Sequence, residues 1–324
     1  MHDVLLFPGH AAYTLDRLER ELNSAEASDI LHRIDDVATT EFGRAGYFLA
    51  SGGPGGGSVR IAVDSPEHAD MAAFALSLAR YRIIQGRQRR SGVLLGHSFG
   101  HLAALTCAGA FCIEDAARLM FHRNRAIAAL PAAATGMACL GLSAARTRRL
   151  LARPDGFGAG EAVIACYNSP IQTVVAGPAA ALSRLRRVAI DNELLYVRLP
   201  ASFAFHTAAA RPAVSAMRRL AAGIRQRPMA GPVFSATLRR FCTDGDDLVG
   251  QMARDLARPV YFLQAVRRLR AAGASSFAEC GPSPLLTRLV AEILPAATVD
   301  AQARTACLAA LIPDRNRWPV TAGP

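Results

Sequence analysis

The residues with the clearest chemical potential lie in the segment Gly96–Gly100, GHSFG. It follows a short apolar segment, Val93–Leu95, and precedes a predicted helix, a setting typical of the sharp turn that exposes a nucleophilic serine. Glycines on both sides allow the strand and the helix to approach closely. The Ser98 hydroxyl would then stand at a helix N-terminus, where the helix dipole favours developing negative charge. The pattern predicts a catalytic serine, and a purely structural glycine turn is the alternative.

A serine nucleophile needs a base, and His206 is the candidate among the eight histidines. It stands shortly after a predicted strand, Leu195–Leu199, and a surface histidine at a strand end is the alternative. His97 belongs to the serine turn itself and is expected to point away from the Ser98 hydroxyl. His101 follows Ser98 by one helical turn and could line the same pocket.

The charged residues narrow the possible mechanisms. The 37 basic residues are all arginine, and the net charge is +11. The absence of lysine excludes Schiff-base, P-loop and Ser–Lys chemistry. A surface rich in arginine suits carboxylate and phosphate, so an acidic protein, a phosphorylated cofactor and nucleic acid are all possible partners. The lack of zinc-finger spacing and of RNP-type motifs, with only 6% aromatic residues, argues against nucleic acid.

The remaining composition points to a globular cytoplasmic protein without metal. The seven cysteines are scattered and include no CxxC pair, which predicts buried reduced thiols and no metal site. No run of 18 clean apolar residues occurs, so no transmembrane helix is expected. The first ten residues, MHDVLLFPGH, lack a basic region and are typical of a strand, not of a signal peptide.

Hydrophobic periodicity and turn residues predict an α/β fold of two parts. Strands at 3–8, 93–95 and 276–279 and helices at 66–87, 98–109 and 114–129 indicate a large α/β domain. Between 132 and 200 the predicted order is strand, helix, strand, strand, helix, strand, which is that of a ferredoxin-like unit. The predicted elements of this unit are 137–142, 144–152, 163–166, 173–175, 179–191 and 195–199, with a turn at 168–170. A loop is expected at 51–58.

These elements predict the domain organisation. Residues 1–131 and 201–312 would form one discontinuous catalytic domain. Residues 132–200 would form the inserted subdomain, and residues 313–324 a loose C-terminal tail.

Six segments occur here in the order and approximate spacing of one known family. The chain resembles the malonyl-CoA:acyl-carrier-protein transacylases and the acyltransferases of polyketide synthases over residues 4 to about 290. This resemblance implies an α/β-hydrolase-like large domain with an inserted ferredoxin-like subdomain, in a discrete, stand-alone enzyme. The segments are FPGH at 7–10, GHSFG at 96–100, arginine at 123, YNSPIQTVVAG at 167–177, AFH at 204–206 and ECGPSPLLTRLV at 279–290.

The resemblance also implies roles for the catalytic groups. Ser98 matches the family nucleophile and His206 its base. In the family a backbone carbonyl orients the histidine, and the matching segment here is Arg258–Phe262. The oxyanion hole would consist of the backbone amides of Phe99 and His10. The family usually has glutamine where His10 stands, but a backbone donor survives that change.

The residues expected to contact the acyl group also follow from the resemblance. Arg123 matches the family arginine that holds the free carboxylate of a malonyl or methylmalonyl group, and a planar guanidinium can bind a carboxylate through two hydrogen bonds. A solvated helix arginine is the alternative for Arg123, and a structural turn residue is the alternative for Asn168. The expected substrate contacts are Arg123, Asn168, Phe203, Phe205 and His97.

Departures from the family pattern bear on the acyl group. The segment FAFH at 203–206 matches the malonyl-type HAFH at three of four positions, and Phe205 would crowd an α-methyl group, so malonyl is favoured. Phe203 and His10 leave room for an unusual acyl group. Histidine stands at position 101, where the family often has glutamate. These differences favour a specialised biosynthetic enzyme over the housekeeping one of fatty acid biosynthesis.

The implied function is ping-pong acyl transfer, with acyl-CoA as donor and no bound cofactor. The acyl group would pass through an acyl-serine to the phosphopantetheine thiol of an acyl carrier protein, in polyketide or other specialised biosynthesis. Carrier proteins are typically acidic, which suits the positive charge. The expected enzyme is a cytoplasmic monomer that binds neither nucleic acid nor membrane.

Other functions remain open at this point. The site could transfer an unusual acyl group, even from carrier to carrier, or hydrolyse acyl thioesters as an editing enzyme. A lipase-like esterase would need an HGGG-type loop and a late histidine, and the chain has neither. A third alternative is a non-catalytic module that only docks carrier proteins and has a degenerate site. The presence of both Ser98 and His206 argues against it.

Overall fold

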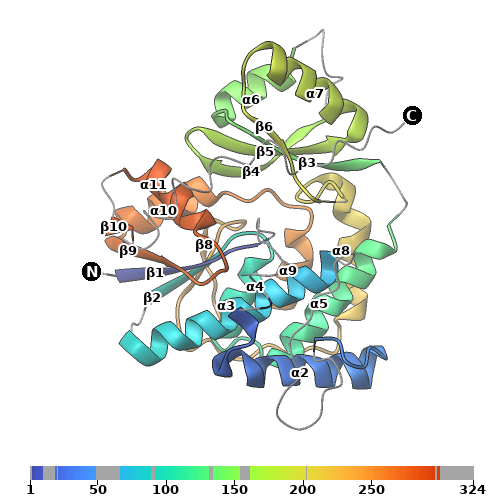
Figure 1. Ribbon diagram of the computed structural model, residues 1–324, viewed down its shortest axis with the longest axis vertical. Helices are drawn as coiled ribbons and strands as arrows, with labels where there is room; N and C mark the ends of the chain where they lie inside the picture. Colours follow the sequence, from blue (N-terminus) through green and yellow to red (C-terminus); the bar gives the residue numbers. More distant parts are fainter. Residues whose placement is uncertain are drawn as a thin grey trace.

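The computed structural model describes residues 2–9, 19, 21–48, 66–88, 92–130, 134–153, 161–201, 203–295 and 298–299. Within these ranges the strands form two sheets, one of six strands and one of four (Figure 1). The four-stranded sheet and its two helices lie at the top of the view, above the larger α/β part. The predicted loop at 51–58 and the tail at 313–324 lie outside the described residues.

The six-stranded sheet has the order β10-β9-β1-β2-β7-β8, and only the edge strand β8 runs antiparallel to its neighbour. Apolar side chains face both sides of its central strand. Val4 and Leu6 belong to one core cluster and Leu5 and Phe7 to the other, as expected for a parallel sheet with both faces covered. The strands are β1 (His2–Phe7), β2 (Gly92–Gly96), β7 (Val233–Ser235), β8 (Arg240–Phe241), β9 (Ala274–Glu279) and β10 (Thr298–Val299).

Helices cover both faces of this sheet. The first core cluster contains buried residues of six helices, and the second contains residues of two further helices together with part of the small sheet. The helices of the first cluster are α2 (Ala25–Phe42), α3 (Pro66–Gln88), α4 (Gly100–Cys107), α5 (Ile113–Ala128), α8 (Arg211–Leu220) and α9 (Leu248–Asp255). Those of the second are α10 (Phe262–Ala271) and α11 (Leu285–Ile293).

The smaller sheet has the order β4-β5-β3-β6 with antiparallel pairing throughout. Its chain order, strand-helix-strand-strand-helix-strand, confirms the predicted ferredoxin-like unit, and with the larger sheet it confirms the α/β fold class. The elements are β3 (Thr135–Leu140), α6 (Ala144–Leu151), β4 (Val163–Ser169), β5 (Gln172–Pro178), α7 (Ala179–Asp191) and β6 (Tyr196–Arg198).

A backbone contact joins the small sheet to the larger part. The amide of Tyr167 donates to the carbonyl of Val260 over 2.8 Å, and the amide of Val260 donates to the carbonyl of Ala165 over 2.9 Å. Val260 thereby extends the sheet beside β4 as an isolated bridge. This contact places the end of β4 next to the segment that follows α9, and both segments contribute to the candidate site.

The structure differs from the prediction at several elements. The turn predicted at 168–170 is wrong in part, because β4 continues through Ser169 and residues 170 and 171 make the turn. Strands β7, β8 and β10 were not expected, because each has only two or three residues and so shows no periodicity. None of the described helices has the length and apolar content needed to cross a membrane.

Candidate active site

Ser98 lies in the sharp connection between β2 and α4. Its φ angle is +56°, a left-handed conformation that is uncommon for a residue with a side chain and that concentrates at functional turns. A Cβ atom at Gly96 would overlap the backbone of His101, and one at Gly100 would overlap the carbonyls of Phe7 and Pro8. Both glycines are therefore required for the close approach of β1, β2 and α4 that presents the serine.

His206 is hydrogen-bonded to Ser98, with 2.7 Å between the serine Oγ and the histidine Nε2. On the other side of the ring, Nδ1 lies 2.8 Å from the carbonyl oxygen of Asp255 and 3.0 Å from that of Arg258. Carbonyls only accept, so Nδ1 carries the proton and Nε2 is left to accept the proton of the serine. This is the tautomer that a general base needs.

The environment of His206 keeps its ring neutral. The side chain is buried, and the pKa is lowered to about 4, mainly by burial and further by the nearby His97 and Arg123, although the two carbonyl contacts raise it. A neutral imidazole can accept the proton of Ser98, whereas an imidazolium cannot.

This pKa makes the pH dependence of serine acylation testable. The base must be neutral, so activity is lost as the pH falls through the pKa of His206 in the free enzyme. We expect kcat/KM for acylation to remain high from pH 6.5, the ordinary histidine pKa, down to about 5, and to fall only near 4. A profile that falls with a midpoint near 6.5 would contradict this environment for His206.

The side chain of Asp255 is anchored by a chain of hydrogen bonds. Thr237 donates to Asp255 Oδ1 over 2.7 Å, and the hydroxyls of Ser235 and Thr237 lie 3.1 Å apart. Gln251 donates to Ser235 over 2.8 Å and reaches His101 Nε2 at 3.1 Å. His101, in the helix that follows the serine, is thus connected to the residue that orients His206.

The carboxyl group of Asp255 is unusual because its Oδ2 is buried and has no hydrogen-bond partner among the described residues. Burial raises its pKa to about 7, against the lowering effects of Thr237, Arg258 and Arg254. The folded chain therefore favours the protonated acid. The stabilisation from this preference is complete below the ordinary pKa of 3.8 and is lost as the pH rises toward 7.

Asp255→Asn should therefore stabilise the protein at alkaline pH. The amide cannot ionise and its oxygen can still accept from Thr237, so we expect an unfolding free energy about 1–3 kcal/mol above wild type at pH 8. The difference should shrink as the pH falls toward 4. Asp191→Asn, at an exposed position, is the control, and urea unfolding at several pH values measures both. Equal stability of Asp255→Asn and wild type at every pH would refute the buried ionisation.

Arg123, on α5, lies beside this pair with its side chain 13% exposed. Its guanidinium carbon is 5.6 Å from the ring centre of Phe99 and 5.5 Å from that of Phe205. Its Nη1 donates to Asn124 Oδ1 over 2.9 Å and lies 3.5 Å from Asp70 Oδ2. The structure thus brings Arg123 close to the serine turn and also to the carboxylate of Asp70, which is not among the predicted site residues.

The other predicted substrate residues are linked to this centre by contacts. His97 does turn to another partner: its Nε2 lies 2.9 Å from Asn168 Oδ1, and Asn168 donates to Gln172 Oε1 over 2.9 Å. Burial lowers the pKa of His97, which favours the neutral form of the ring, although the contact with Asn168 raises it. The rings of Phe203 and Phe205 lie 5.6 Å apart, and Phe203 is buried.

The structure describes one of the two residues of the predicted oxyanion hole, Phe99. The amide of Phe99 has no acceptor within the described ranges, so it remains available to a substrate oxygen. His10, the second expected donor, lies outside the described residues. A Cβ at Gly9 would overlap the carbonyl of His97, so the chain that leads to His10 passes directly against the serine turn.

Two acidic residues and one amide of this region were missed at the sequence level: Asp70, Asp255 and Gln251. Each lies within or at the end of a helix, and nothing in its local pattern distinguishes it from a solvated residue. Asp70 reaches the site because α3 packs against α4 and α5, and Gln251 and Asp255 of α9 reach it through their hydrogen bonds to His101 and His206.

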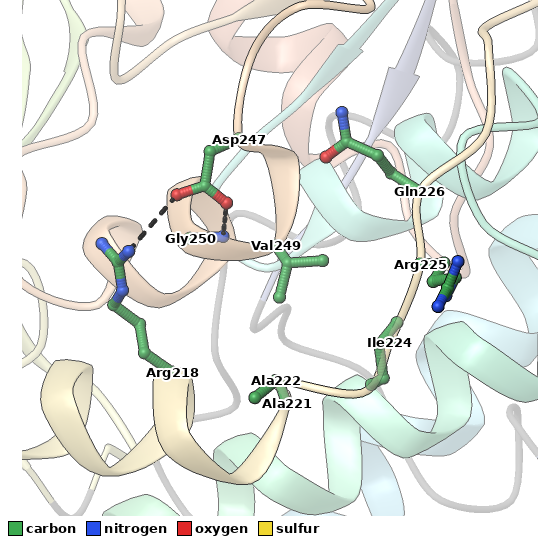
Figure 2. Close-up of a pocket in the computed structure, with 9 residues that line it drawn as sticks. All are labelled: Arg218, Ala221, Ala222, Ile224, Arg225, Gln226, Asp247, Val249 and Gly250. Atoms are coloured by element: carbon green, nitrogen blue, oxygen red, sulfur yellow. Dashed lines mark hydrogen bonds and ion pairs between the residues drawn. The ribbon is translucent and has the colours of Figure 1, made fainter.

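A separate surface pocket lies between α8 and the start of α9 (Figure 2). Asp247 accepts from the amide of Gly250 over 2.7 Å and pairs with Arg218, its Oδ2 3.6 Å from the guanidinium. The pocket shares no residue with the serine centre. Asp247 caps the N-terminus of α9, the helix whose other end carries Asp255.

The chain is similar to one known protein family over almost its whole length. The model of the acyl transferase domain family matches residues 8–322. Spectinabilin polyketide synthase system protein NorC of Streptomyces orinoci is 30% identical over 300 residues, which cover 92% of this chain and 13% of that protein. Polyketide biosynthesis protein ThaF of Burkholderia thailandensis is 36% identical over 202 residues, 62% of this chain and 17% of that protein. The chain thus spans a small part of both relatives.

Solved structures show the same fold. The malonyl CoA-acyl carrier protein transacylase of Coxiella burnetii superposes with a TM-score of 0.76 at 22% identity, covering 92% of each chain. A malonyl-transacylase solved with its type II polyketide synthase acyl-carrier protein, PlMCAT:AntF, gives a TM-score of 0.77 at 23% identity, covering 92% of this chain and 95% of that one. Since the family model matches almost from end to end and the fold agrees, this chain belongs to the acyl transferase domain family.

Proposed function

We propose that this chain transfers an acyl group from acyl-CoA to the phosphopantetheine thiol of an acyl carrier protein by way of an acyl-serine. The observation that carries the proposal is the 2.7 Å contact between Ser98 Oγ and His206 Nε2, with Nδ1 held by two carbonyls. Membership of the acyl transferase family supports the reaction class.

The proposed mechanism has two half-reactions. His206 takes the proton of Ser98 while Oγ attacks the thioester carbonyl, and the oxyanion accepts from the amide of Phe99 and, we propose, that of His10. The thiolate of CoA leaves with the proton from His206. The carrier thiol then gives its proton to His206 and attacks the acyl-serine, and the serine alkoxide recovers that proton.

Two features support the proposed partners. A malonyl-transacylase of the same fold was solved together with its acyl carrier protein. The net charge of +11 would steer an acidic carrier toward this chain. We propose a cytoplasmic role in polyketide or related specialised biosynthesis, since both relatives described above are polyketide proteins.

We propose a malonyl-type acyl group, because Arg123 presents its guanidinium beside Phe99 and Phe205, the neighbours of the catalytic pair in the chain. Its Nε and Nη2 make no hydrogen bond with any described residue, so both are available for the carboxylate of a malonyl group. Phe205 limits the space beside that carboxylate.

The direct test is to incubate the protein with a panel of acyl-CoAs and to measure the mass of the intact chain. We expect one malonyl adduct per chain, which disappears when a holo carrier protein is added. A protein that forms no adduct with any acyl-CoA would overturn the proposal. Release of free acid in place of transfer would establish the hydrolase alternative.

Arg123→Ala should change acyl selectivity. The variant leaves the malonyl carboxylate without its guanidinium partner, so we expect kcat/KM for malonyl-CoA to fall about a hundredfold or more. Acetyl-CoA has no carboxylate and should lose far less, which inverts the ratio. Arg125→Ala, on the same helix but exposed, is the control. Equal losses for malonyl-CoA and acetyl-CoA would refute the assignment of Arg123 to the carboxylate.

A further inference from the structure

The proposed carboxylate-binding arginine already has a carboxylate beside it. Asp70 lies on α3, and its Oδ2 is 3.5 Å from Arg123 Nη1 on α5. The side chains are 7% and 13% exposed, so the pair is largely removed from water. These helices are distant in sequence, and their packing places the acidic group at the site.

Asp70 approaches the guanidinium of Arg123 from the side of Nη1. Nη1, the nitrogen nearest Asp70, also donates to Asn124 Oδ1 over 2.9 Å. Phe99 and Phe205 contact the guanidinium through their rings, and both are chain neighbours of the catalytic pair. A substrate carboxylate on Nε and Nη2 would therefore share one positive charge with Asp70.

Because Asp70 and a substrate carboxylate would share the positive charge of Arg123, the preference of the site for an anionic acyl group is weakened. Asp70 already neutralises Arg123, and a second carboxylate a few ångströms away would be repelled by the first. In a buried site such repulsion is comparable in size to the attraction of the guanidinium, because screening by water is reduced. An uncharged acyl group meets a neutral ion pair and is not penalised in this way.

We propose that Asp70 sets the acyl selectivity of this site by neutralising Arg123, so that the chain transfers uncharged short acyl groups beside carboxylated ones. The inference rests on the proposed acyl transfer, and it names a substrate class beyond malonyl: short unbranched acyl groups without a carboxylate. Asp70 acts through Arg123, so it is a specificity-determining residue and not a catalytic one.

The test compares acylation of Ser98 by malonyl-CoA and by acetyl-CoA in wild type and in Asp70→Asn. The asparagine keeps the size of the side chain and removes its charge. We expect the ratio of kcat/KM values, malonyl over acetyl, to rise at least tenfold. Asp70→Ser, a second uncharged variant, should raise the ratio in the same direction, and Asp70→Glu, which keeps the charge, should leave it near the wild-type value.

Glu67→Gln supplies the matched control, because it removes a half-exposed negative charge from the same helix and should leave the ratio unchanged. The role of Asp70 would be overturned if the malonyl-over-acetyl ratio of kcat/KM values fell, or stayed within twofold of wild type, in both Asp70→Asn and Asp70→Ser. That outcome differs from failure of the proposed function, in which wild type itself forms no acyl-enzyme with either donor. Thermal unfolding of each variant shows that the compared proteins are folded.

Discussion

Ser98→Ala is expected to abolish formation of the acyl-enzyme. Ser98 has the only hydroxyl that the described structure places in hydrogen-bond contact with the buried imidazole of His206. Alanine removes the atom that would form the ester, and no other hydroxyl within the described ranges contacts His206. Intact-protein mass spectrometry after incubation with malonyl-CoA should show the adduct on wild type and none on the variant.

The control for this experiment is Ser28→Ala, which removes an exposed hydroxyl from α2 and should leave acylation unchanged. The strained φ of +56° at position 98 is the same for serine and alanine, so the two proteins should fold alike. An adduct of undiminished yield on Ser98→Ala would place the nucleophile elsewhere in the chain.

His206→Asn should lower the rate of Ser98 acylation by at least about a hundredfold, the usual effect of losing a general base. Asparagine suits this position because the backbone of His206 has a φ of +62°, and asparagine tolerates the left-handed region better than most residues. The amide cannot take the serine proton, so the effect should fall on kcat rather than on KM. Single-turnover acylation by malonyl-CoA measures this rate.

His32→Asn is the matched control, because His32 is exposed on α2 and its replacement should change neither step. Transfer from the acyl-serine to the carrier should slow in His206→Asn as well, since the same base serves both half-reactions. Near-normal turnover of the variant would separate His206 from the reaction and remove the basis for the serine–histidine mechanism.

The serine turn was predictable from local sequence signals. The segment GHSFG between an apolar strand and a helix predicted the β2–Ser98–α4 connection, because glycines at fixed positions and a short apolar run are local signals. The ferredoxin-like order of β3 to β6 was also predictable, since its strands are long enough to show their pattern. The very short strands β7 and β8 carry no such pattern.

The partners of the functional groups depend on contacts between distant segments. Ser98 and His206 are 108 positions apart, and His206 and Asp255 are 49 apart, so no local pattern gives their distances. The family resemblance implied a carbonyl from Arg258–Phe262, and the structure places the carbonyl of Arg258 at 3.0 Å, together with that of Asp255. The catalytic and substrate-binding roles themselves remain predictions that the variants above test.

The sequence alone determined the reaction class that the site could support, because residue type limits chemistry: a serine in a glycine turn, a histidine, and arginine as the sole basic side chain apart from histidine. The tertiary structure decided how these groups are tuned. Packing of α3 against α5 brought Asp70 to Arg123, and packing of α9 brought the Asp255 carbonyl to His206. Electrostatic tuning depends on distance and burial, which arise only when segments far apart in the chain fold together.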